Sequence, residues 1–417
     1  MKEMFHSVKL IDEKCIGCNQ CMINCPVQAV RLKDSKAIIY DDRCIDCGEC
    51  IKVCPHNAHV AEKNEIDVID GFKIKVALPS VTIYTQFGNY VNPTLVEEGI
   101  KSLGFDEVFD MSYACDIVAE ICKKEIKNTP KPAISNFCPT VVRLIQSNFP
   151  DLLAHIVKVM DPIEVAAGLV REKYIAMGYK NDEIGVFYLS SCVTWITRAK
   201  YTSLNPDFEI NASIAISDLY TPILKYIQKN ADKSLGNTSD LSYSGLSWAT
   251  IGGEGEYMGA PEYISVDGVV NVIRVLEDIE KGKFHDLDYI EAMACAEGCV
   301  GGLFSVDNPY NARRVMKKFK GNIKKKHDLS KLKDNRKQEF KINTNVNMGA
   351  NQKLGDDFLS ALKKMKHMNN LINLLPGYDC SQCGSPSCKA FAEDVVRGLS
   401  TIDGCKFIKE DLTKYES

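Results

Sequence analysis

Residues 15–26 read CIGCNQCMINCP, and residues 44–55 read CIDCGECIKVCP. Both stretches have the spacing C-x2-C-x2-C-x3-C-P, and the second follows the first at an offset of 29 residues (44 − 15). Three thiolates at this spacing can surround one face of a cubane, while the fourth points away toward a second cluster. Structural zinc sites rarely use such a triple. The repeat therefore predicts two [4Fe–4S] clusters in a small N-terminal module.

This repeat resembles that of bacterial two-cluster ferredoxins. The resemblance implies a ferredoxin-like α+β module over residues 1–65, in which each motif gives its last cysteine to the other cluster. One cluster would be held by Cys15, Cys18, Cys21 and Cys54, and the other by Cys25, Cys44, Cys47 and Cys50. Because every ligand position is then filled, we expect His56 and His59 to be surface or hydrogen-bonding residues.

The whole chain has 417 residues, 18 cysteines and a formal net charge of −4, which argues against a dedicated nucleic-acid binder. Disulfide frameworks usually belong to short secreted chains, and this chain is long. Its start lacks the apolar segment of a signal peptide, and no stretch approaches the ~18 apolar residues of a membrane span. We therefore expect a cytoplasmic protein with no membrane span, whose cysteines bind metal in a reducing, anaerobic setting.

A third cysteine motif lies near the other end of the chain. Residues 375–388 read LPGYDCSQCGSPSC, and Cys405 follows after sixteen more residues, across a segment with helical spacing. The motif resembles the four-cysteine iron–sulfur domain of corrinoid iron–sulfur proteins and of the cluster subunit of Rnf-type complexes. The resemblance implies a small, mostly helical module over residues 358–417. A zinc site on the same cysteines is the alternative to an iron–sulfur cluster. A third [4Fe–4S] cluster would be held by Cys380, Cys383, Cys388 and Cys405.

Four cysteines of the middle region follow predicted elements. Cys138 precedes a proline that suits the first position of a helix, where the helix dipole favours a thiolate. Cys192 comes just after an apolar strand over residues 186–190, at the edge where open α/β sheets bind ligands. Cys295 and Cys299 follow another strand, in a glycine-rich loop that allows close approach to a cofactor.

The region over residues 70–325 resembles the catalytic domain of [FeFe]-hydrogenases, an α/β domain. CPTVVRLIQSNFP at residues 138–150 is similar to the first cluster motif of that family, Cys192 lies at the second, and EAMACAEGC at residues 291–299 is similar to the third. The resemblance implies a fourth [4Fe–4S] cluster on Cys138, Cys192, Cys295 and Cys299. In that family the last cysteine also bridges to a diiron subcluster.

Three positions beside these cysteines depart from the family pattern. Phe137 stands where the family has a cysteine that delivers protons, and a phenyl ring cannot transfer a proton. Trp195 stands where a lysine binds a cyanide ligand, and an indole brings one hydrogen-bond donor but no charge. Glu297 lies where the third motif usually has Pro-Gly. We therefore expect the cubane to be kept, with a diiron subcluster as the less favoured alternative.

The remaining features are less specific. Cys115 and Cys122 share a helix face and are expected to be buried structural cysteines, with a redox-active pair as the alternative. Residues 252–259, GGEGEYMG, are expected to form a flexible loop over the metal site. The basic stretch 313–341 predicts a solvated helix face, or else a docking surface for an acidic redox partner. Residues 326–357 read as a polar linker.

Three functions fit these features. The first is an iron–sulfur protein that relays electrons in redox sensing or electron transfer, without efficient hydrogen turnover. Its expected partner is a redox protein such as ferredoxin or flavodoxin, or a signalling protein. The second is an oxidoreductase of ferredoxin-hydrogenase type, with a modified site near Cys299, Glu297 and Trp195. The third is a scaffold that hands clusters or electrons to a partner, with the C-terminal module as its docking arm.

Overall fold

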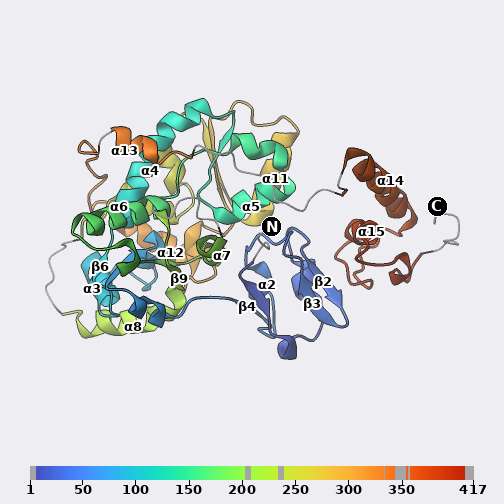
Figure 1. The fold of residues 1–417 in the computed structure, drawn as a ribbon, viewed down its shortest axis with the longest axis horizontal. Coiled ribbons are helices and arrows are strands. Elements are labelled where there is room, and N and C mark those ends of the chain that lie inside the picture. Colours follow the sequence, from blue (N-terminus) through green and yellow to red (C-terminus); the bar gives the residue numbers. More distant parts are fainter. Residues whose placement is uncertain are drawn as a thin grey trace. The chain divides into compact units, whose positions relative to one another are not determined.

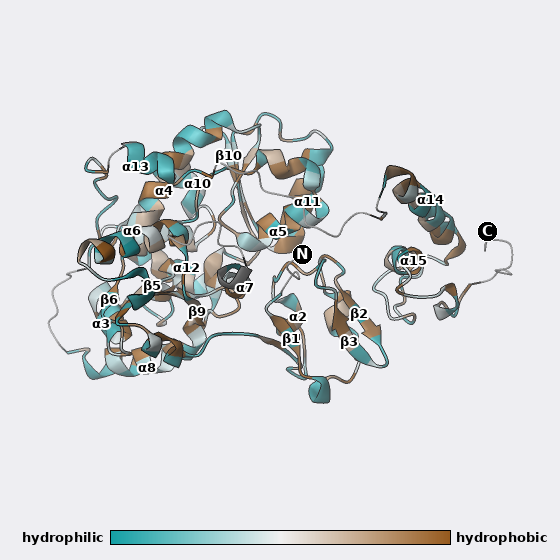
Figure 2. Ribbon diagram, viewed as in Figure 1, coloured by the Kyte–Doolittle hydropathy of each residue, from teal (hydrophilic) through white to brown (hydrophobic). Residues whose placement is uncertain are grey.

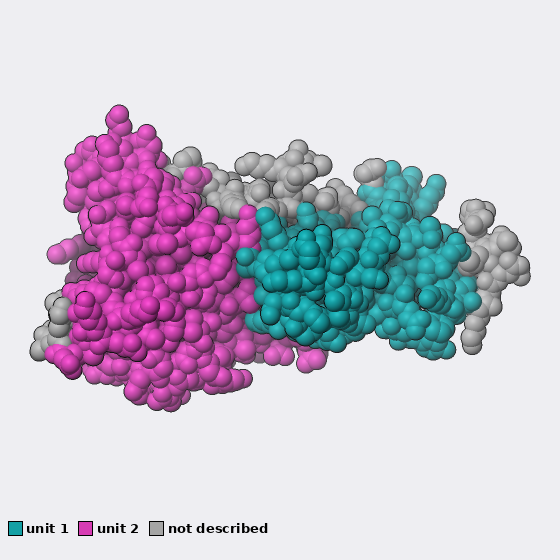
Figure 3. Space-filling view, turned by 90° about the horizontal axis from the view of Figure 1, so that it is seen from below, with its two compact units in different colours: residues 1–61, 348–417 teal, residues 62–347 magenta. Residues whose placement is uncertain are grey.

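The computed structural model describes residues 6–201, 208–232, 239–332, 334–342, 354–355 and 357–408. It forms two compact units, which are coloured separately in Figure 3. The first, here called the terminal unit, joins both ends of the chain, Met1–Ala61 and Met348–Ser417. The second, the central unit, comprises Glu62–Asn347.

The N-terminal part of the terminal unit repeats one small motif. Its strands form two antiparallel pairs, β1 (Val8–Leu10) with β4 (His59–Ala61) and β2 (Val30–Lys33) with β3 (Lys36–Ile39). Its helices α1 (Gln20–Ile23) and α2 (Glu49–Lys52) each carry the third cysteine of a motif. Asn19 and Gly48 precede these helices at equivalent repeat positions and both adopt the left-handed conformation, with φ of 61° and 76°. The sequence repeat is thus also a structural one.

The C-terminal part of the terminal unit consists mainly of two helices, α14 (Phe358–Leu374) and α15 (Cys388–Val396). They pack around a small core of Leu371, Leu375, Phe391 and Ala392. The helix predicted between Cys388 and Cys405 is confirmed as α15. The first turn of α14 exposes Phe358 and Leu359, and the distribution of apolar residues along this helix can be followed in Figure 2.

Two parallel sheets form the framework of the central unit, in the orders β6-β5-β8-β9 and β10-β11-β7. Their strands are β5 (Ile74–Pro79), β6 (Glu107–Val108), β7 (Ala133–Ile134), β8 (Ile184–Ser190), β9 (Ala212–Ala215), β10 (Tyr263–Asp267) and β11 (Tyr289–Met293). β8 and β11 are buried along their whole length, as expected for parallel strands covered on both faces. The strand predicted before Cys192 is confirmed as β8.

Helices surround these sheets, as Figure 1 shows. Sheets and helices together enclose one large apolar core. They are α3 (Pro93–Lys101), α4 (Met111–Glu125), α5 (Pro139–Asn148), α6 (Pro162–Ala176), α7 (Thr194–Tyr201), α8 (Ile216–Lys229), α9 (Tyr243–Leu246), α10 (Gly253–Met258), α11 (Val269–Glu280), α12 (Pro309–Phe319) and α13 (Asp334–Glu339). Cys115 and Cys122 are buried on α4, which confirms their predicted burial. None of the helices in the described ranges combines the length and apolar character needed to cross a membrane.

The expectation of a flexible loop over residues 252–259 is wrong. Most of this stretch is the helix α10, and Gly253, Glu254 and Gly255 are buried. A side chain at Gly253 would place its Cβ 1.9 Å from the Ser247 carbonyl oxygen. These glycines therefore serve close packing rather than chain flexibility.

The stretch predicted as a polar linker is partly packed. His327 and Phe340 are buried in the central unit, and α13 also lies in this stretch. Several cations of the basic stretch form ion pairs, among them Lys341 with Glu125 at 2.8 Å. The predicted docking of an acidic partner at this stretch stays a prediction.

Candidate metal centres

Four cysteines of the ferredoxin-like repeat surround one cavity. Its lining includes Cys15, Cys18, Cys21 and Cys54, the first of the predicted ligand sets. Burial, followed by the nearby thiols of the other three, raises the pKa of Cys21 to about 11. The cost of ionising these crowded thiols would be offset by a bound metal, which deprotonates its thiol ligands.

His59 gives this cavity an unsatisfied polar group. The side chain is 2% exposed, and neither ring nitrogen has a hydrogen-bond partner. The expectation of a surface residue is therefore wrong for His59, whereas its role as a hydrogen-bonding residue stays a prediction. Because buried polar groups normally find a partner, the unpaired imidazole fits a site that holds a further acceptor, such as a cluster sulfide. We infer that these residues suit a [4Fe–4S] cluster.

The structure brings together three cysteines of the second predicted ligand set, which comprises Cys25, Cys44, Cys47 and Cys50. Burial raises the pKa of Cys50, and the nearby thiols of Cys47 and Cys25 add to this effect. The backbone amide of Ala29 donates to Cys25 Sγ at 3.2 Å, and in the other half of the repeat Ala58 donates to Cys54 at 3.3 Å. Cys44 Sγ lies 3.9 Å from Asp46 Oδ1. The role of Cys44 as a ligand of the second cluster stays a prediction.

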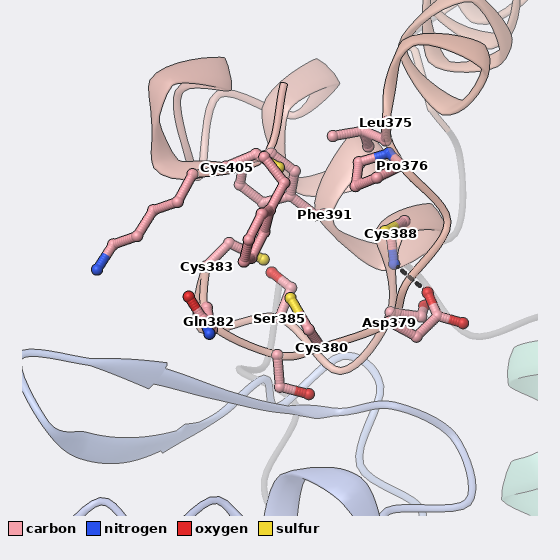
Figure 4. A pocket seen from close by; sticks show the side chains of 14 residues that line it. Leu375, Pro376, Asp379, Cys380, Gln382, Cys383, Ser385, Cys388, Phe391 and Cys405 are labelled. Carbon is pink, nitrogen blue, oxygen red and sulfur yellow. Dashed lines mark hydrogen bonds between the residues drawn. The ribbon is translucent and has the colours of Figure 1, made fainter. Parts of the chain in front are cut away.

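The C-terminal cysteines line a second cavity, shown in Figure 4. The lining includes Cys380, Cys383, Cys388 and Cys405. Burial raises the pKa of Cys383, and the neighbouring thiols of Cys405 and Cys380 contribute in the same direction. Asp379 Oδ1 accepts the backbone amide of Cys388 at 2.7 Å and so fixes the first turn of α15. The four positions could hold one further cluster.

The central unit brings together four cysteines that lie far apart in sequence. Cys138 caps α5, directly after β7, while Cys192 follows β8 in the other sheet. Cys295 and Cys299 follow β11, the neighbour of β7. Burial, followed by the nearby thiols of Cys138, Cys295 and Cys192, raises the pKa of Cys299 well above its usual range. The strand ends thus place all four predicted ligands in one group, in which each cysteine is partly buried.

Close contacts hold the three cysteine-bearing loops in place. Thr140 Oγ1 of α5 lies 2.7 Å from Thr194 Oγ1 of α7. The amide of Phe304 donates to the Ser191 carbonyl at 3.0 Å, and a Cβ at Gly302 would lie 2.3 Å from the same oxygen. Only glycine permits this approach between the second and third loops. The spacing of the central cysteines is therefore set by the protein fold.

Aromatic side chains occupy the two altered positions beside these cysteines. Phe137 packs on Trp248, with ring centroids 5.0 Å apart. Trp195 is 5% exposed and meets Tyr188 edge to face at 5.4 Å. The Arg198 guanidinium lies 4.9 Å from the Trp195 ring centroid. These rings add apolar packing and no group that exchanges protons near neutral pH.

Glu297, the third altered position, is held in an ion pair. Its carboxylate lies 2.6 Å from Arg313, and its amide donates to Asp267 Oδ2, also at 2.6 Å. The residue adopts φ of 61°, in the left-handed region. Its charge is thus partly neutralised by Arg313, a partner that the sequence did not indicate.

Sequence reasoning missed a pair of buried carboxylates, Glu254 on α10 and Glu291 on β11. Glu291 accepts from the amides of Gly252 and Gly255, both at 3.0 Å, and from Ser265 Oγ at 2.7 Å. Glu254 is bonded to the Tyr289 hydroxyl. Burial, followed by the Glu291 charge, raises the pKa of Glu254 to about 8. Burial also raises the pKa of Glu291, but its hydrogen bonds from Ser265, Gly255 and Gly252 lower it. These bonds favour the charge on Glu291 and the proton on Glu254.

Family comparisons identify the central unit. The model of the iron-only hydrogenase large subunit, C-terminal domain, matches residues 73–260 and 223–303, more than half of the chain. The chain belongs to this hydrogenase family. A 4Fe–4S dicluster model matches residues 14–58, and a model described as a putative Fe–S cluster matches residues 375–407. The protein is thus a hydrogenase-related iron–sulfur protein with an α/β central domain and a ferredoxin-like module.

Three hydrogenases to which the chain is similar share only a small part of its sequence. Iron hydrogenase 1 of Clostridium pasteurianum is 25% identical over 294 residues, 56% of this chain and 50% of that protein. The chain thus spans about half the length of this relative. The periplasmic [Fe] hydrogenase large subunit of Nitratidesulfovibrio vulgaris is 25% identical over 372 residues, 72% of this chain and 86% of that one. A solved variant of the [FeFe]-hydrogenase HydA1 from Chlamydomonas reinhardtii aligns with a TM-score of 0.45 at 14% identity, covering 59% of this chain and 84% of that one.

Proposed function

We propose that this member of the hydrogenase family relays electrons through four [4Fe–4S] clusters and does not turn over hydrogen efficiently. Its role would be electron transfer or redox sensing, with ferredoxin, flavodoxin or a signalling protein as the partner. The observation that carries the proposal is the central site. There, the four cysteines meet while Phe137 and Trp195 are packed as aromatic side chains.

The protein's own residues support one-electron chemistry at this site. The clusters would supply reversible one-electron storage. The partly buried cysteines would hold the central cluster, and the fixed strand ends would limit how far their sulfurs move between redox states. Efficient electron transfer needs such small rearrangements, whereas hydrogen turnover also needs proton delivery. Phe137 provides none.

The first test counts electrons and hydrogen in the same sample. The protein is produced in a host that assembles diiron subclusters, and Cys299→Ala serves as the control. We expect uptake of about four electrons per chain, one for each [4Fe–4S] cluster. Hydrogen release should not exceed that of the control. Release that disappears in Cys299→Ala would contradict the proposal.

A reductase with a modified site is the second candidate, and Glu254 favours it. A protonated carboxyl group buried in the central unit could donate a proton to a small molecule reduced near Cys299. This function predicts that an added substrate oxidises the reduced protein catalytically. Glu254→Gln should then slow turnover while leaving the iron content unchanged. A pure relay would show no dependence on Glu254.

A further inference from the structure

A buried ion pair joins the two parts of the terminal unit. Arg31 of β2 meets Asp394 of α15, and both side chains are 2% exposed. Arg31 Nη2 lies 3.0 Å from Asp394 Oδ1, and Arg31 Nε is bonded to the other carboxylate oxygen. Ser385 Oγ also donates to Asp394 at 2.9 Å. A buried charge pair with these additional bonds requires a fixed geometry, because separating it would leave each charge unpaired in the interior.

Further polar contacts surround this ion pair. Arg43 Nη2 lies 2.9 Å from Glu393 Oε1. The guanidinium groups of Arg31 and Arg43 lie 5.1 Å and 5.6 Å from the ring centroid of Tyr40. The contact between Arg43 and Glu393 joins residues 350 positions apart in the chain. The C-terminal module is thus docked on the ferredoxin-like module rather than free as an arm.

One backbone hydrogen bond links the two cysteine cavities directly. The amide of Leu32 donates to the Gly384 carbonyl at 2.8 Å. Leu32 lines the cavity of the first ferredoxin-like site, and Gly384 directly follows Cys383 of the C-terminal site. A Cβ at Gly384 would lie 2.2 Å from the Leu32 carbonyl oxygen. Glycine is therefore needed for this close approach.

We propose that the Leu32–Gly384 contact is an electron junction between the C-terminal site and the ferredoxin-like site formed by Cys15, Cys18, Cys21 and Cys54. One electron leaves the reduced site and enters the oxidised one, and no bond breaks and no proton moves. This inference rests on the proposed relay of electrons through bound clusters.

The C-terminal site would be the port at which a one-electron carrier exchanges electrons with the chain. Cys380 is exposed, and Tyr378, which meets Phe407 at 5.9 Å, is 61% exposed.

The test compares two glycines of the same module. Gly384→Ala would force Leu32 and Gly384 apart, whereas Gly398→Ala meets nothing within 4 Å and has a similar positive φ, 73° against 81°. Paramagnetic resonance spectra of the fully reduced protein report magnetic interaction between neighbouring clusters. We expect an interaction between the C-terminal cluster and the first ferredoxin-like cluster in the wild type and in Gly398→Ala. In Gly384→Ala this interaction should be lost, with unchanged iron.

An unchanged interaction in Gly384→Ala, or its absence from a fully loaded wild type, would overturn the junction. A wild type with fewer than four clusters would instead contradict the proposed relay, so the two failures are distinguishable. If Gly384→Ala loses iron, Asp394→Asn decides the question, because it weakens the ion pair with Arg31 from α15, replaces no residue of the cysteine loop and keeps an oxygen that can accept from Ser385. Glu393→Gln, at the partly exposed ion pair, is its control and should keep the interaction.

Discussion

The two units of this protein place cysteines around a site in opposite ways. In the terminal unit, most ligands of each site come from one short motif, and the apolar cores are small. One apolar cluster of the N-terminal module, for example, has the buried members Cys21, Met22, Val30 and Ala37. In the central unit, the cysteines come from three distant loops, and an extensive core fixes the strands that carry them. We therefore expect the terminal unit to depend on bound metal for its folding, whereas the central unit folds around its own core and so positions its metal ligands.

The largest expected effect is the response to cluster removal. Small modules with little core depend on metal for folding, whereas a domain with a large core does not. Chelation of iron under reducing conditions should therefore abolish protection from hydrogen exchange in β2, β3 and α15. Protection of β8 and β11 should persist. Equal loss of protection from hydrogen exchange in both units would contradict the expectation that only the terminal unit needs metal to fold.

Replacing one cysteine ligand of the central site should lower the iron content of the protein but leave the fold of the central unit intact. Cys192→Ala is expected to lose about four irons per chain, because its cubane loses a ligand. The central unit should still unfold cooperatively, since its core is intact. Cys122→Ala, which alters a buried cysteine outside the predicted ligand sets, should keep all its iron. If the iron content of Cys192→Ala equals that of the wild type, the central site is wrongly assigned.

The buried carboxylates of the central unit should make its stability depend on pH. Between the usual pKa near 4.5 and the raised pKa of Glu254, about 8, the folded state binds more protons than the unfolded state. Stability therefore falls as pH rises through this window, by at most about 1.4 kcal/mol per pH unit for one group. Glu254→Gln should flatten this slope.

Denaturant unfolding at a series of pH values measures this effect. The exposed neighbour provides the control, because Glu256→Gln should retain the wild-type slope. His327 also titrates with a raised pKa, of about 9, but its contribution is common to all three proteins and cancels in the differences. Parallel slopes for Glu254→Gln and the wild type would show that Glu254 ionises normally in the folded protein.

The smallest expected effect concerns the first ferredoxin-like site. If His59 donates to a cluster sulfur, His59→Leu should lower the reduction potential by about 40 mV, equivalent to a hydrogen bond of roughly 1 kcal/mol. His59→Gln, which keeps an N–H donor, should restore part of the potential. A redox titration followed by paramagnetic resonance measures this shift. An unchanged potential in His59→Leu would mean that the imidazole donates no bond to the cluster.

Features that depend on local residue spacing could be predicted from the sequence, whereas features that depend on packing between distant residues could not. The spacing of Cys15, Cys18 and Cys21 indicates a cluster by itself, and Pro139 indicates the start of α5. Glycines at residues 252–259 favour a loop in any local reading, yet contacts with Ser247 and Glu291 stabilise a buried helix there. The Arg31–Asp394 pair has no sequence signal at all, because its members are 363 residues apart.

The central claim is that the hydrogenase-like site holds a cubane without a diiron subcluster. Infrared spectroscopy of protein matured in a host that assembles diiron subclusters tests it most directly, because carbon monoxide and cyanide ligands give distinct bands. We expect no such bands, together with about 16 irons per chain, four for each cluster. Carbon monoxide and cyanide bands, accompanied by about two further irons, would contradict it.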